Sequence, residues 1–80
     1  MTKVEYRKCE MLMDEAIRKA NDSNADYKAF ERLSKEGKEI DAGCKQRLAD
    51  QEIGYAEGIN QAFAVLGFKH DRMKDLFDLL

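Results

Sequence analysis

The chain has 80 residues, a formal net charge of −2, two cysteines and one histidine. This composition excludes a concentrated basic surface for nucleic acid, the four Cys or His ligands of a structural zinc site, and the apolar stretch of about 20 residues that spans a membrane as a helix. We therefore expect one domain over residues 1–80, without metal or cofactor, in the cytoplasm and with reduced cysteines.

An apolar stripe near the start of the chain indicates the fold class. Its members follow one another at alternating steps of three and four residues, as in the seam of a helix packed along another helix. They are Tyr6, Cys9, Met13, Ala16, Ala20, Ser23, Tyr27 and Phe30. Thr2 and Glu5 have the spacing of a capping box. No proline interrupts the pattern, so we expect a helix over residues 3–36.

The segment 21–26, with the sequence NDSNAD, is the weakest part of this helix. Asn, Asp and Ser compete for backbone hydrogen bonds and are poor residues for a helix interior. The stripe nevertheless resumes in phase at Tyr27, so we favour a kinked helix over a break. The alternative is a turn at 21–26 and a compact bundle of three or four helices, with Cys9 and Cys44 nearly level.

Glycines mark the ends of the predicted long helices. Gly37 is typical of the residue that follows a helix, and Asp41 is a plausible N-cap for a second helix over residues 40–66. Gly67 would end that helix, with Phe68 folding back on its last turn. The apolar residues that we assign to this helix are Leu48, Ile53, Tyr55, Ala56, Ile59, Ala62, Phe63 and Leu66.

A short third helix is predicted over residues 70–80. One side carries Met73, Leu76, Phe77 and Leu80, and the other carries Asp71, Asp75 and Asp78. The apolar side could lie in a groove on a partner protein, with the aspartates against a basic surface. In the alternative, the apolar side docks on the chain's own long helices. The predicted fold is all-α, an antiparallel, coiled-coil-like helical hairpin with a short C-terminal helix.

Small residues in the second helix favour self-association. Gly54, Gly58 and Ala62 lie four apart on one ridge, and a glycine inside a helix costs about 1 kcal/mol relative to alanine. Close approach of another helix would explain them. The run 62–66 is apolar around most of the helix, so Phe63 must be covered by the third helix, a second copy or another partner. We therefore predict a homo-oligomer that uses Gly54, Gly58, Ala62 and Phe63.

One acidic pattern resembles an enzyme family. Glu36 and Glu39 form an ExxE pair that is similar to the Mg²⁺-binding pair of all-α nucleotide pyrophosphohydrolases of the MazG type. That family carries ExxD on the next helix, whereas here Glu57 is followed by Asn60. The resemblance implies hydrolysis of nucleoside triphosphates, but it lacks one carboxylate. No catalytic constellation accompanies His70, so we do not expect an enzyme.

The predicted function is therefore that of a non-enzymatic protein-binding module that acts through helix faces. It would serve as an adaptor or as an inhibitor of a larger host complex. An accessory protein of a phage or mobile element, acting in the manner of anti-CRISPR proteins, is one form of this hypothesis. A self-assembling structural subunit is the alternative from a different class.

Overall fold

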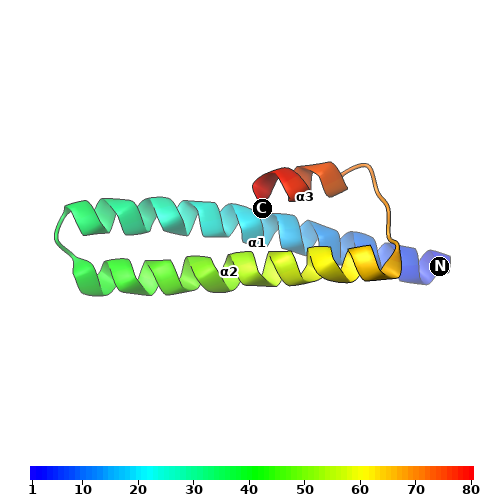
Figure 1. Ribbon diagram of the computed structural model, residues 1–80, viewed down its shortest axis with the longest axis horizontal. Coiled ribbons are helices and arrows are strands. Elements are labelled where there is room, and N and C mark those ends of the chain that lie inside the picture. Colours follow the sequence, from blue (N-terminus) through cyan, green and yellow to red (C-terminus); the bar gives the residue numbers. More distant parts are fainter.

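Three helices and no strands make up the computed structural model, which describes all residues 1–80. α1 (Lys3–Lys35) and α2 (Glu39–Leu66) lie antiparallel along a molecule of 51 × 17 × 17 Å, and α3 (Met73–Leu79) folds back over α1 (Figure 1). The predicted all-α fold, an antiparallel hairpin with a short C-terminal helix, is confirmed.

α1 is continuous through residues 21–26, so the alternative turn and the compact bundle are wrong. The polar residues of this segment find partners on α2 instead of breaking the helix. The hydroxyl of buried Ser23 donates a hydrogen bond of 2.8 Å to the carbonyl of Ala49. Asp26 forms an ion pair with Lys45, in which Oδ1 lies 3.5 Å from Nζ. These contacts satisfy side chains that would otherwise compete for the backbone of α1.

Both long helices end in the same backbone motif. Gly37 and Gly67 have positive φ angles of 76° and 69°, which glycine adopts without strain. After α2, the amide of Phe68 donates to the carbonyl of Phe63 at 3.0 Å, and the two rings lie 4.8 Å apart. After α1, the amide of Lys38 donates to the carbonyl of Leu33 at 2.9 Å. These are Schellman motifs, as predicted at Gly67.

Two predicted helix starts need correction. α2 begins at Glu39, after Lys38, and Asp41 does not cap it. Asp41 lies in the first turn instead, where its negative charge stabilises the helix dipole. α3 begins at Met73 rather than at residue 70, because the segment before it forms a turn tied to α1.

The contact between the long helices is built from small side chains. α2 contributes a buried residue at every seventh position: Ala42, Ala49, Ala56 and Phe63. α1 contributes the predicted stripe, of which Cys9, Met13, Ala16, Ala20 and Ser23 are buried. Of the apolar residues assigned to α2 from the sequence, Ala56 and Phe63 lie in this contact, whereas Leu48, Tyr55 and Leu66 are exposed. Alanines at heptad spacing form the contact, and the larger side chains flank it.

The core has two connected parts. One joins Cys9, Met13, Phe63 and Phe68 near the α2–α3 connection, and the other joins Ala16, Ala20, Ala56 and Leu76 under α3. Phe63 and Leu76 are almost fully buried by the chain itself. They were predicted as contact residues for other molecules. α1 and α3 already cover both side chains, so neither can contact another molecule while α3 is docked.

The small contact residues predict that a larger side chain there will push the helices apart. Ala49→Leu should lower the free energy of unfolding by about 1–3 kcal/mol, because an overpacked core forces its neighbours to shift. Ala64→Leu, at an exposed position of α2, is the matched control and should change little. Thermal unfolding followed by circular dichroism measures both. Equal melting temperatures for the two variants would contradict the tight seam.

α3 offers a second matched pair. Leu76→Ala should weaken the docking of α3 by about 2–5 kcal/mol, because it leaves a cavity at a fully buried site. Phe77→Ala removes a larger side chain, but one that is 70% exposed, and should have little effect. Hydrogen exchange across residues 70–80 reports the docking directly. If both variants accelerate exchange equally, α3 does not dock through Leu76.

Candidate functional site

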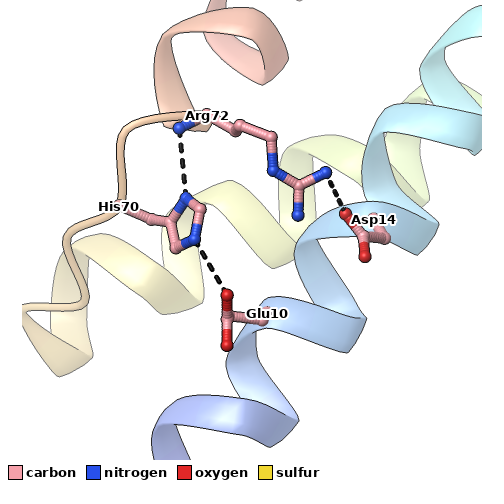
Figure 2. A network of polar contacts seen from close by, with 4 residues as sticks. All are labelled: Glu10, Asp14, His70 and Arg72. Atoms are coloured by element: carbon pink, nitrogen blue, oxygen red, sulfur yellow. Dashed lines mark hydrogen bonds and ion pairs between the residues drawn. The ribbon is translucent and has the colours of Figure 1, made fainter.

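A network of polar contacts ties the connection before α3 to α1 (Figure 2). His70 Nε2 lies 3.0 Å from Glu10 Oε2, and the Arg72 guanidinium lies 2.6 Å from Asp14 Oδ1. The backbone N–H of Arg72 donates to His70 Nδ1 at 3.1 Å, which assigns the ring proton to Nε2 and directs it at Glu10. The only histidine therefore holds the connection in place.

Aromatic rings reinforce this attachment. The ring centroids of Tyr6 and Phe68 lie 5.2 Å apart, and those of Phe68 and His70 lie 6.1 Å apart. Phe68 is buried between them and the core. The position of α3 is thus fixed at its start by both stacking and charge.

Docking of α3 divides the residues that were predicted to bind a partner. Leu76 is buried and Met73 is half-buried against the core, so these two hold α3 on the chain. The remaining predicted residues are exposed: Asp71, Asp75, Phe77, Asp78 and Leu80. The exposed side of α3 and of the turn before it therefore carries three aspartates, Lys74 and one large exposed ring.

The residues predicted for self-association do not form one surface either. Phe63 is buried, whereas Gly54, Gly58 and Ala62 are exposed. A Cβ atom added to either glycine would meet nothing within 4 Å. No helix of this chain approaches the glycines, so close packing at that ridge remains a prediction about another molecule.

The hairpin has a second long side, opposite α3, which sequence reasoning missed. α3 is bound to α1 through Glu10 and Asp14, and Ile17 and Ile53 pack against the core beneath it. Residues two positions apart lie about 200° apart around a helix. Leu12 is two positions from both Glu10 and Asp14, so it faces away from α3. Lys19, two positions after Ile17, and Tyr55, two positions after Ile53, face away from α3 for the same reason.

We call this side the open face. It holds two shallow hollows of about 340 and 380 Å³ that share Glu15. Lys19 Nζ lies 5.9 Å from the centroid of the Tyr55 ring, a cation–π contact that joins the two helices across this face. The residues of the open face are Lys8, Met11, Leu12, Glu15, Lys19, Leu48, Gln51, Glu52 and Tyr55.

Glu52 is the most unusual residue of the open face. It lies on the seam between Ala49 and Ala56, at a position where a coiled coil normally has an apolar residue. Its buried Oε1 atom has no hydrogen-bond partner. Burial of the carboxyl, followed by the neighbouring carboxylates of Asp26 and Asp22, raises the pKa of Glu52 to about 7, while Lys19 opposes the shift. The group therefore changes charge near neutral pH.

The acidic pair that resembles the MazG type is not arranged as in that family. Glu36 caps the end of α1 and forms an ion pair of 3.4 Å with Lys38, whereas Glu39 begins α2. The turn at Gly37 thus separates two carboxylates that the family carries on one helix. No group of three potential ligands for a metal ion is found in the chain.

The open face left one signal in the sequence. Alanines at positions 42, 49 and 56 repeat every seven residues, and this repeat places Leu48 and Tyr55 beside the seam rather than in it. The larger side chains concealed the repeat because hydropathy is dominated by Leu, Ile and aromatic residues. None of the three helices contains a segment with the length and the hydropathy of a membrane span.

Comparison with known proteins found no match to a family model, a curated protein or a solved structure.

The environment of Glu52 predicts that stability falls as the pH rises. Its pKa in the folded chain, about 7, lies above the ordinary value of 4.5, so the folded state binds the proton more tightly. The contribution to stability is fully present below pH 4.5 and is lost as the pH rises through 7. Glu52→Gln, which stays neutral, should flatten this dependence and stabilise the chain at pH 8 by about 1 kcal/mol.

Urea unfolding at pH 5, 6, 7 and 8 measures this effect. Glu57→Gln, at an exposed carboxylate of the same helix, is the control and should follow the wild-type curve. A pH slope that survives in Glu52→Gln would place the titrating group elsewhere.

Proposed function

We propose that the chain is a non-enzymatic protein-binding module that acts through its helix surfaces, as an adaptor or as an inhibitor of a larger complex. The open face is the observation that supports this function. Two hollows run along this side of the hairpin, and three large apolar residues border them. These are Leu12, Leu48 and Tyr55, which are 42%, 44% and 42% exposed. Apolar surface gathered in this way usually marks a binding site.

The form of the open face favours a protein over a small ligand. Small-molecule sites enclose most of their ligand in a deep cavity, whereas these hollows are shallow and lie along two helices. An exposed tyrosine and leucines, bordered by Lys19 and Glu15, match the apolar centre and polar rim of a protein interface. A helix or helical pair of a partner would fit such a groove.

The outer side of α3 supports a second contact. Asp71, Asp75 and Asp78 are exposed, as is Phe77. A basic surface on a partner would complement these charges, and the ring of Phe77 would add apolar contact. An inhibitor could use this side against a surface that otherwise binds nucleic acid.

The proposed location is a reducing compartment such as the cytoplasm. Both cysteines are free, with Cys9 buried in the core and Cys44 exposed on α2. An exposed thiol is compatible with a compartment that keeps cysteines reduced.

Matched surface variants test the proposed function. The immobilised chain should capture a defined protein from a lysate of its source cells, and Leu48→Glu should abolish that capture by placing a charge in the apolar centre. Val65→Glu is the control, because Val65 is 87% exposed and does not border the open face. Capture that is equally strong with Leu48→Glu and the wild type would reject the open face as the binding site.

A further inference from the structure

The accessible surface of the chain is large for its mass. It amounts to 5801 Å², whereas a compact monomer of 9.2 kDa exposes about 4,900 Å². The excess, about 900 Å², is close to the area of about 800 Å² that each partner contributes to a standard protein interface. One interface of ordinary size would therefore bring the exposed surface to that of a compact protein.

The core also indicates that the single hairpin buries little apolar surface. Only 11 of the 80 residues are buried, and five of these are alanines at the contact between the long helices. They are Ala16, Ala20, Ala42, Ala49 and Ala56. Alanine contributes little apolar area, so the seam supplies less stabilisation than larger side chains would. Small helical chains commonly obtain the rest by self-association.

The shape of the molecule suits one mode of association. The hairpin is straight, 51 Å long and 17 Å across, and two such hairpins can pack side by side into a four-helix bundle. α3 covers part of one long side (Figure 1). The open face lies on the other side, which α3 leaves accessible. The open face presents apolar residues from both long helices to a second hairpin: Leu12 from α1, and Leu48 and Tyr55 from α2.

The charges of the open face are self-complementary. Lys8, Glu15 and Lys19 alternate in sign along its α1 border. In a two-fold dimer whose axis passes between Glu15 and Lys19, the patch meets itself in reversed order, so Lys19 of each copy can lie against Glu15 of the other. A partner with a surface of a single charge would match only half of these groups.

From the area, the shape and the charge pattern, we propose that the open face binds a second copy of this chain, forming a two-fold four-helix bundle with Leu12, Leu48 and Tyr55 at its centre. This inference rests on the proposed function, protein binding through helix surfaces. It assigns the open face to a second copy, so that a larger complex would be bound by the outer side of α3. The α3 helices would lie on the two outer sides of the bundle, with their acidic surfaces free.

Light scattering coupled to gel filtration, over a range of concentrations, tests the proposal on the purified chain. The wild type should reach a mass of about twice 9.2 kDa. Leu48→Glu and Leu12→Glu, one on each long helix, should each weaken dimerisation by at least about 30-fold, the loss typical of a central interface residue. Val65→Glu should dimerise like the wild type. Circular dichroism should show unchanged helix content, because all three positions are exposed in the single chain.

A mass of 9.2 kDa at every concentration would overturn the dimer. A dimer weakened by Val65→Glu but not by Leu48→Glu would overturn its location. If a variant fails to fold, an NMR dilution series of the wild type tests the location instead. As the dimer dissociates, the methyl signals of Leu12 and Leu48 should shift, and those of Val65 should not. A monomer that captures another protein through Leu48 would leave the proposed function standing and reject the inference. Failure of both experiments at Leu48 would reject both.

Discussion

The close approach of α1 and α2 through small side chains is the constraint on which the rest of the structure depends. Alanines at every seventh position of α2 meet Ala16, Ala20 and Ser23 of α1. Where these small side chains meet, the helices lie close together, and larger residues such as Leu48 and Tyr55 are placed on the flanks of the seam. α3 covers part of one flank, and the other remains as the open face.

The same constraint explains why polar groups matter at this contact. Ser23 fits the narrow seam and donates to the carbonyl of Ala49, so it is fully satisfied. Glu52 is too large and too polar for its position, and its carboxyl lies half-buried beside Asp26 without a partner for Oε1. A seam of small residues thus accommodates one hydroxyl without strain, but it makes one carboxylate sensitive to pH near neutrality.

Local signals in the sequence were sufficient for the start of α1, for the C-terminal ends of both long helices and for the hairpin. The capping box of Thr2 and Glu5 and the glycine at position 67 each act through neighbours in the chain, and each is found as predicted. Features that depend on residues distant in the sequence could not be predicted. The phase of α2 is decided by the stripe of α1 that faces it, and the ion pair of Asp14 with Arg72 joins residues that no local pattern connects. The open face follows from that phase, so it was missed as well.

The contacts that hold the chain together differ widely in sequence separation. Asp26 and Lys45 are 19 residues apart, Ser23 and Ala49 are 26 apart, and Glu10 and His70 are 60 apart. The entropy lost in closing a loop rises with its length, so contacts near Gly37 form at the smallest entropic cost. We therefore expect the hairpin to assemble from its turn outward and α3 to dock last. Pulse-labelling hydrogen exchange during refolding would then protect the amides around Gly37 before those of α3, which is also the element expected to detach most readily.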